Sequence, residues 1–321
     1  MSQILANGLT FEYETFGRPQ APAILLVMGL GGQLTLWPES FCRALAEAGY
    51  YVIRYDNRDV GLSSKIDAAG KPRLLRAGIA YTLGLPVKAH YTLDDMAQDA
   101  VALLDALKIK RAHVIGTSMG GMIAQILAAK FPHRLSSLTS VMSSSGNPKL
   151  PGPAWKIRLR MVKRPGTADR ETLVQHAMGT WRLICSPDYQ PSEEELRSRI
   201  EEGFARSSYP PGLARQTLAI LASGSRLKLL SSIRVPTLIL HGAADRLIPV
   251  AAAYELVEHI PGAQLEIVQG MGHDLPDPLI PRMVSSILRH IAHTEQTGRG
   301  ERLRSRARKL EELVPLAANA A

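Results

Sequence analysis

Residues 112–122 read AHVIGTSMGGM, and this stretch decides the fold. It begins with a short apolar run that includes the β-branched residues Val114 and Ile115, which is typical of a strand. From Met122 onward, apolar residues recur at helical spacing. Between the two patterns, Ser118 is flanked by glycines in the arrangement G-x-S-x-G. The stretch therefore predicts a strand, a sharp turn at Ser118 and a helix.

A turn of this kind would expose the hydroxyl of Ser118 at the edge of the sheet, in strained backbone. Gly116 and Gly120 are expected because a side chain at either position would collide with the neighbouring strand or helix. The following helix directs its free N–H groups toward the same place, which favours a developing negative charge. Because G-x-S-x-G alone is a weak signal, a nucleophilic role for Ser118 depends on a histidine and an acid elsewhere.

Strand and helix patterns alternate through most of the chain. Strands are expected at residues 9–16, 23–28, 51–55, 138–142, 237–240 and 265–268, whereas residues 153–223 contain only helical patterns. This organisation predicts an α/β fold, a mostly parallel doubly wound sheet with an inserted all-helical lid. The expected divisions are a core at 1–145 and 226–293, a lid at 146–225 and a basic tail at 294–321.

Two further loops carry residues that would complete a catalytic site. Asp245 follows the strand expected at 237–240, and His273 follows the strand expected at 265–268. Ligand-facing residues of parallel sheets lie at such carboxyl ends. His273 would take the proton of Ser118, and Asp245 would hold the imidazole in the required tautomer. The alternative for Asp245 is a structural role as the cap of the next helix.

A tetrahedral oxyanion needs two N–H donors. The backbone of Met119, the residue after the serine, supplies one donor, and the loop after the strand at 23–28 supplies the other, which is expected to be Leu30. Gly29, Gly31 and Gly32 let the backbone of this loop approach a substrate. The loop lacks a following Lys-Ser/Thr pair, which excludes a phosphate-binding loop.

The lid is expected to set substrate choice and to contribute little to the chemistry. Its joints, SSSGNP at 143–148 and SGS at 223–225, contain glycines and serines that permit hinge motion. Several large lid residues are candidates for the pocket lining, with packing inside the lid as the alternative for each of them. They are Trp155, Trp181, Met178, Tyr209, Met161 and Leu183.

Composition limits the remaining functional classes. The chain has 321 residues, of which 45% are hydrophobic and 21% are charged, as expected for a globular protein. No apolar run is long enough to span a membrane, and the N-terminus has no signal-peptide pattern. The two cysteines, Cys42 and Cys185, are too few for a disulfide framework, so free thiols and a cytoplasmic location are expected.

The net charge is +9, with basic residues concentrated at 156–170 and 299–309. Neither segment interleaves aromatic residues with the charges and no nucleic-acid motif occurs, so a nucleic-acid partner is not expected. No cluster of His, Cys and carboxylate residues suggests a metal, and no cofactor is expected. The carboxylates of Asp94, Asp95 and Asp99 lie on a predicted helix and are expected to face solvent.

Five motifs carry a family resemblance: VMGLGGQLTLWP, RYDNRDVGLS, VIGTSMGG, HGAADRLIP and MGHD. Over residues 9–292 the chain resembles the α/β-hydrolase superfamily of lid-bearing esterases and is similar to the aclacinomycin methylesterase-like hydrolases. The resemblance supports a triad in the chain order Ser118, Asp245, His273. It also implies that RYDNRDVGLS, with Asp56, Arg58, Gly61 and Ser63, is a structural turn beside the site. Many relatives have His-Gly before the oxyanion residue, whereas this chain has Met-Gly, which removes a side-chain support of the loop but keeps the backbone donor.

The sequence thus predicts a carboxylesterase-type serine hydrolase that forms an acyl-enzyme with a small-molecule ester. A serine nucleophile argues against haloalkane dehalogenases and epoxide hydrolases, whose relatives use a carboxylate at that position. Carbon–carbon bond hydrolysis of a diketone and perhydrolysis use the same triad and remain alternatives. A ligand-binding receptor on a hydrolase frame is the alternative of another class, although such proteins usually lose the triad that this chain retains.

Overall fold

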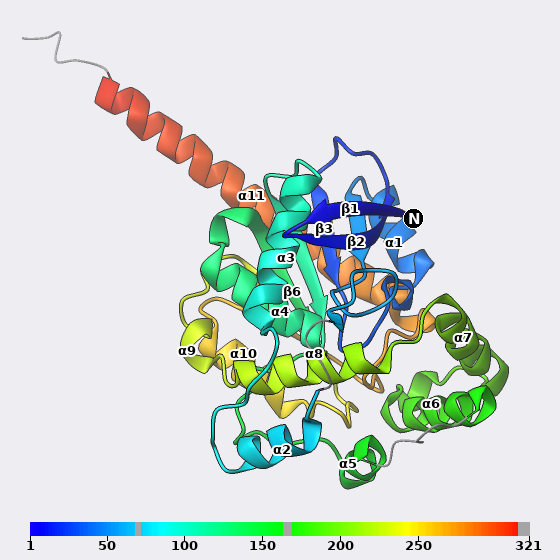
Figure 1. Ribbon diagram of the computed structural model, residues 1–321. Helices are drawn as coiled ribbons and strands as arrows, with labels where there is room; N and C mark the ends of the chain where they lie inside the picture. Colours follow the sequence, from blue (N-terminus) through cyan, green and yellow to red (C-terminus); the bar gives the residue numbers. More distant parts are fainter. Residues whose placement is uncertain (68–71, 163–168, 314–321) are drawn as a thin grey trace, which may run out of the picture.

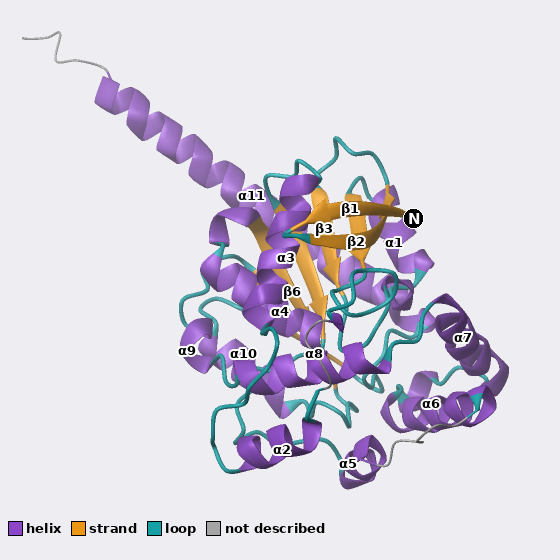
Figure 2. Ribbon diagram, in the orientation of Figure 1, coloured by secondary structure: helices purple, strands orange, loops and turns teal. Residues whose placement is uncertain are grey.

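A sheet of eight strands forms the centre of the protein (Figure 2). The computed structural model describes residues 1–67, 72–162 and 169–313, with side chains described for 1–67, 72–160 and 169–296. The strands are β1 (Ser2–Ala6), β2 (Leu9–Phe16), β3 (Ala23–Val27), β4 (Tyr51–Tyr55), β5 (Ala112–Thr117), β6 (Leu135–Val141), β7 (Thr237–Gly242) and β8 (Gln264–Val268).

The strand order across the sheet is β1-β2-β4-β3-β5-β6-β7-β8. β1 pairs antiparallel with β2, β2 pairs antiparallel with β4, and the other neighbouring pairs are parallel. The predicted α/β fold with a mostly parallel sheet is therefore confirmed. The sequence pattern did not indicate β1, an edge strand with a single partner, and β6 begins three residues before the expected strand at 138–142.

Helices follow the strands on both faces of the sheet (Figure 1). Those outside the segment between β6 and β7 are α1 (Glu39–Glu47), α2 (Leu74–Thr82), α3 (Leu93–Ala106), α4 (Met119–Lys130), α10 (Ala251–His259) and α11 (Ile280–Leu313). Those between β6 and β7 are α5 (Trp155–Val162), α6 (Arg170–Ile184), α7 (Glu193–Arg206), α8 (Pro210–Ser223) and α9 (Leu227–Leu230). Short 3₁₀ helices occur at Leu34–Leu36, Pro132–Arg134, Pro187–Tyr189 and Asp277–Leu279.

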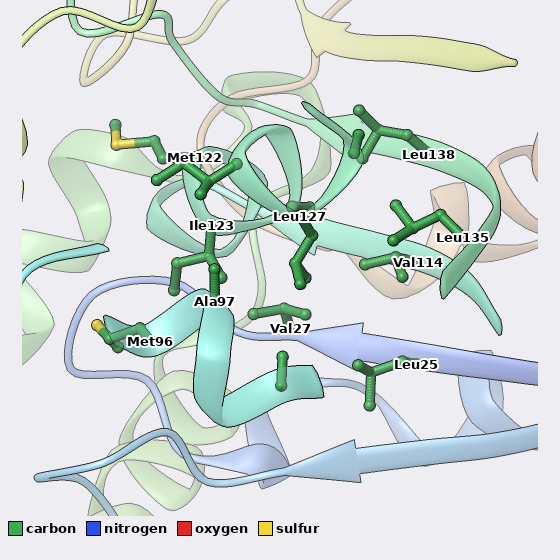
Figure 3. Packing of buried hydrophobic residues seen from close by; sticks show 14 of the residues in the cluster. Leu25, Val27, Met96, Ala97, Val114, Met122, Ile123, Leu127, Leu135 and Leu138 are labelled. Atoms are coloured by element: carbon green, nitrogen blue, oxygen red, sulfur yellow. The ribbon is translucent and has the colours of Figure 1, made fainter. Parts of the chain in front are cut away.

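The core lies on both faces of the sheet. The central strand β3 is therefore buried along its whole length. Successive strand residues point to opposite faces. Leu25 and Val27 accordingly join the cluster that packs under α3 and α4, whereas Ile24 and Leu26 join the cluster under α1 and α11. Figure 3 shows part of the first cluster, in which side chains of α3 and α4, such as Ala97 and Ile123, lie near side chains of the strands, such as Val27.

The sequence pattern predicts a last helix at 280–291 and a separate weak helix near 303–313, whereas α11 continues without a break from Ile280 to Leu313 (Figure 1). No proline occurs between Arg282 and Leu313, so no residue lacks the backbone N–H that a helix needs. The side chains of the basic segment at 299–309 lie outside the described residues. Within the described part of the chain, no helix is both long and apolar enough to cross a membrane.

The turn RYDNRDVGLS is held by buried ion pairs. Arg58 forms two hydrogen bonds to the Asp99 carboxylate, at 2.5 and 2.6 Å, and Asn7 donates a third. Asp99 is buried, so the expectation that it faces solvent is wrong. Asp94 and Asp95 lie in the first turn of α3, where Asp95 forms a capping box with Thr92.

The helical segment between β6 and β7 is attached to this same turn. We call residues 146–225 the lid. Arg215 of α8 forms two bonds of 2.8 Å to Asp59, and Arg206 of α7 lies 2.8 Å from Asp56. Burial alone would raise the pKa of Asp59, but hydrogen bonds from Arg215, Ile66 and Tyr91 hold it below its ordinary value. The Asp59 carboxylate therefore stays ionised and anchors the lid.

We expect Arg215→Met to destabilise the protein by about 3–5 kcal/mol, because it leaves the buried Asp59 carboxylate without its cation. The matched control is Arg197→Met, which breaks an exposed lid ion pair with Glu171 and should cost much less stability, because solvent screens exposed charges. Urea unfolding of both variants measures the difference. Equal losses would contradict the anchoring role of the buried pair.

Candidate active site

Ser118 lies in the turn between β5 and α4, where the two flanking glycines have no room for a side chain. Its φ of 52° is in the left-handed region, which L-residues rarely occupy. A Cβ on Gly116 would lie 2.2 Å from the carbonyl oxygen of Gly120, and one on Gly120 would lie 2.0 Å from that of Val27. The close approach that the G-x-S-x-G pattern predicts therefore exists, and it forces Ser118 to the carboxyl end of the sheet.

The structure brings together the three residues proposed from the sequence for the triad. The Nε2 atom of His273 lies 3.0 Å from the hydroxyl oxygen of Ser118. Its Nδ1 atom lies 2.7 Å from a carboxylate oxygen of Asp245. Because an ionised carboxylate only accepts, Nδ1 carries the proton and Nε2 is left to accept the serine proton. His273 and Asp245 are both buried.

Asp245 is oriented by its own loop. Its second carboxylate oxygen accepts the backbone N–H groups of Leu247 and Ile248, at 2.9 and 2.8 Å. α10 begins later, at Ala251, with Val250 as the cap residue, so Asp245 does not cap that helix. The carboxylate is thus fixed in a loop turn, with one oxygen left for His273.

His241, at the end of β7, is a neighbour of the site that the sequence pattern did not indicate. Its Nε2 atom lies 2.8 Å from the carbonyl oxygen of Ile248 and 3.5 Å from the Asp245 carboxylate. Burial lowers the pKa of His241, so its imidazole is neutral. The neutral His241 therefore packs beside the Asp245 carboxylate and does not compete with His273 as a cationic partner. His241 is the first residue of the motif HGAADRLIP, but nothing in the spacing of that motif indicates a contact between His241 and Asp245.

The loop after β3 passes directly over the serine. A Cβ on Gly29 would lie 3.1 Å from the Cβ of Ser118, so a larger residue there would require the two segments to shift by a few tenths of an ångström. The backbone N–H groups of Leu30 and Met119, the two expected oxyanion donors, have no hydrogen-bond partner among the described residues. They are therefore available to an oxygen bound beside Ser118.

Polar side chains from two other segments hold this loop. The carbonyl of Met28 accepts a hydrogen bond from Asn57 at 2.9 Å, and the N–H of Gly31 donates to Gln216 of α8 at 2.8 Å. Gln216 also donates to the carbonyl of Arg58 at 2.7 Å. The Met28 sulfur accepts a hydrogen bond from Thr117 at 3.4 Å. These contacts hold the loop after β3 in place.

A cavity of about 780 Å³ lies between the lid and the core. The core contributes residues beside the site, including Gly31 from the loop after β3 and Asp274 next to His273. The lid contributes residues of α6, α7 and α8. Ser118 and His273 do not themselves line it. The cavity therefore lies beside the triad, between the loop after β3, the loop that carries His273 and the lid.

The structure places the proposed pocket residues in different environments. Trp181 and Tyr209 line the cavity. Met178 is fully buried among the helices of the lid, with Val174 and Ile200. Trp155 is 69% exposed and does not line the cavity. Leu183 does not line it either, and the side chain of Met161 lies outside the described residues.

Comparisons with known proteins agree with this architecture. The family model described as "alpha/beta hydrolase fold" matches residues 22–277. Rhodomycin D methylesterase DnrP of Streptomyces peucetius is 30% identical over 89% of this chain and 96% of its own length. 3-Oxoadipate enol-lactonase 2 of Acinetobacter baylyi is 28% identical over 83% of this chain and 87% of its own length.

Among solved structures, the enol-lactonase from Burkholderia xenovorans superposes with a TM-score of 0.71. It is 24% identical and the alignment covers 91% of this chain and all of that one, so this likeness concerns the fold. The family model spans most of the chain, and the motifs that carried the resemblance lie at the positions just described. The protein therefore belongs to the α/β-hydrolase fold family.

Proposed function

We propose that this protein is a serine carboxylic ester hydrolase that works through an acyl-enzyme. The observation that carries the proposal is the continuous hydrogen-bonded chain from Ser118 through His273 to Asp245. A serine hydroxyl is a weak nucleophile at neutral pH unless a base takes its proton. His273 is within hydrogen-bond distance to do so, and Asp245 stabilises the imidazolium that forms.

The reaction proceeds in two steps. Ser118 Oγ attacks the ester carbonyl carbon while its proton passes to His273 Nε2, and the resulting tetrahedral oxyanion binds the N–H groups of Leu30 and Met119. His273 then returns the proton to the departing alkoxide, which leaves an acyl group on Ser118. Water, activated by His273 in the same way, releases the acid and regenerates the serine. Each oxyanion donor is worth about 3 kcal/mol of transition-state stabilisation.

The intact contact geometry distinguishes this proposal from a ligand-binding receptor. A receptor has no need for an imidazole held between a carboxylate and a serine at 2.7 and 3.0 Å. Diketone hydrolysis and perhydrolysis would use the same three residues, and no observation in the described part of the chain favours either of them. Ester hydrolysis agrees with the methylesterase and lactonase names of the relatives.

Replacement of Ser118 by alanine should abolish ester hydrolysis and leave the fold intact, because it removes one oxygen at a turn whose backbone bonds remain. The matched control is Ser144→Ala, which removes a hydroxyl whose hydrogen-bond partner among the described residues is the N–H of Gly146. Turnover of 4-nitrophenyl esters and labelling by a fluorophosphonate, detected as an increase in protein mass, measure the effect. More than about a hundredth of the parent activity in the Ser118 variant would show that another residue is the nucleophile.

We further propose that the lid selects esters with a bulky acid part. The volume of about 780 Å³ far exceeds what a short acyl chain needs and falls within the range of drug-sized ligand pockets. Trp181 lies on the lid side of this cavity, where a ring would pack against a large acyl group. The methylesterase relative, whose name implies a small alcohol part, is compatible with this arrangement.

Trp181→Ala should change the preference among methyl esters of acids of increasing size, while turnover of methyl acetate changes little because acetate does not reach the ring. Trp155→Ala is the matched control, since Trp155 belongs to the same lid but does not line the cavity. The measurement is kcat/KM for each ester with each variant. An equal loss on every ester would mean that Trp181 supports the fold and not selectivity.

A further inference from the structure

The lid contacts the loop that carries His273. The backbone N–H of His273 donates to the carbonyl of Ile184, at the end of α6, at 2.7 Å. A Cβ on Gly272 would lie 2.6 Å from the backbone of Cys185, so the two backbones are packed against each other there. This contact places lid atoms directly against the residue proposed as the catalytic base.

Ser186, the next lid residue, bridges the two neighbours of His273. Its hydroxyl oxygen accepts the N–H of Gly272 at 2.8 Å. Its N–H and its hydroxyl both donate to the same carboxylate oxygen of Asp274, at 2.9 and 2.5 Å. Ser186 is fully buried and does not line the cavity. It therefore contacts the loop on both sides of the histidine without contacting a molecule bound in the cavity.

The Asp274 carboxylate depends on these donors. Burial raises the pKa of Asp274 above its ordinary value, and the hydrogen bonds from Ser186 act in the opposite direction. No cation forms a salt bridge with Asp274 among the described residues. The main role of this carboxylate toward the protein is thus to accept the Ser186 bonds.

We propose that Ser186 and Asp274 form a positioning pair through which the lid holds the His273 imidazole between Asp245 and Ser118. This inference rests on the proposed function, because it assigns the pair to the orientation of the catalytic base. The two imidazole contacts are short, and a displacement of about 1 Å in a catalytic group can lower turnover about a hundredfold. The lid is then part of the catalytic machinery and not only a filter for substrates.

The first test is a double-mutant cycle with Ser186→Ala, Asp274→Ala and the double variant. We expect each single variant to lower kcat about tenfold or more. Because both residues act through one contact, kcat of the double variant should be about equal to kcat of the less active single variant. KM of the Ser186 variant should stay within about threefold of the parent value, since Ser186 does not line the cavity. Losses in kcat that multiply in the double variant would overturn the pair.

Asp274→Asn separates position from charge. An asparagine keeps an oxygen that can accept both Ser186 bonds but carries no negative charge. We expect kcat of this variant to stay within about threefold of the parent value, well above that of Asp274→Ala. If Asp274→Asn lowered kcat as much as Asp274→Ala does, the charge of Asp274 would be what matters, and the positioning role would be overturned. This comparison does not require that the Ser186 variant folds.

The control is Ser198→Ala, which removes the hydroxyl of a lid serine that bonds to Glu202 of the same helix, α7. It should leave kcat unchanged. A loss similar to that of Ser186→Ala would mean that any loosening of the lid lowers activity, and the specific pair would be overturned.

A readout that does not depend on turnover separates this proposal from the proposed function. The Nδ1 proton of His273, bonded to Asp245, should give a low-field proton resonance that is absent in His273→Ala. We expect Ser186→Ala to shift or broaden this resonance and Ser198→Ala to leave it unchanged. An unchanged resonance together with parent-like kcat would overturn the positioning role. If Ser118→Ala retained ester hydrolysis, the proposed function would fail, while the resonance would still report whether the lid orients the imidazole.

Discussion

The close backbone approach at the turn after β5 is the constraint on which the rest of the structure depends. α4 passes so near β3 and β5 that a Cβ at Gly120 would lie 2.0 Å from the carbonyl oxygen of Val27. This packing drives Ser118 into the left-handed region and exposes its hydroxyl at the end of the sheet. The same packing brings the start of α4 and the loop after β3 together, so the serine and two free N–H groups meet in one place.

Buried charges explain how the remaining parts stay in place around that turn. The loop after β4 presents Asp56, Arg58 and Asp59, and each is paired with a residue from another segment. Two of the partners, Arg206 and Arg215, belong to the lid. A buried charge that loses its partner is costly, so these pairs favour one arrangement of lid and core. The loop after β3 shares this support, because Gln216 bonds to both Gly31 and the carbonyl of Arg58.

The lid therefore has two kinds of contact with the site. Its cavity-lining residues, such as Trp181 and Tyr209, face the cavity between the lid and the core. Its buried polar residues, such as Gln216 and Ser186, hydrogen-bond to the loop after β3 and to the loop that carries His273. The joint at 143–148 also hydrogen-bonds to the residue that follows the second joint, because the N–H of Arg226 donates to the carbonyl of Ser145. A Cβ on Gly146 would lie 2.5 Å from the carbonyl oxygen of Gly224, so the two joints are packed side by side.

The sequence by itself determined the elements whose signals are local. The apolar run at 23–28 and the G-x-S-x-G turn each depend on neighbouring residues, and the position of Asp245 and His273 after expected strands, together with their chain order, pointed to both residues. Tertiary structure decided which large lid residues line the cavity, and that Asp99 is buried against Arg58. It also decided that Gln216 reaches Gly31 across 185 residues and Ser186 reaches Asp274 across 88. No local periodicity encodes such contacts, because they arise only when separate segments pack and their buried polar groups must find partners.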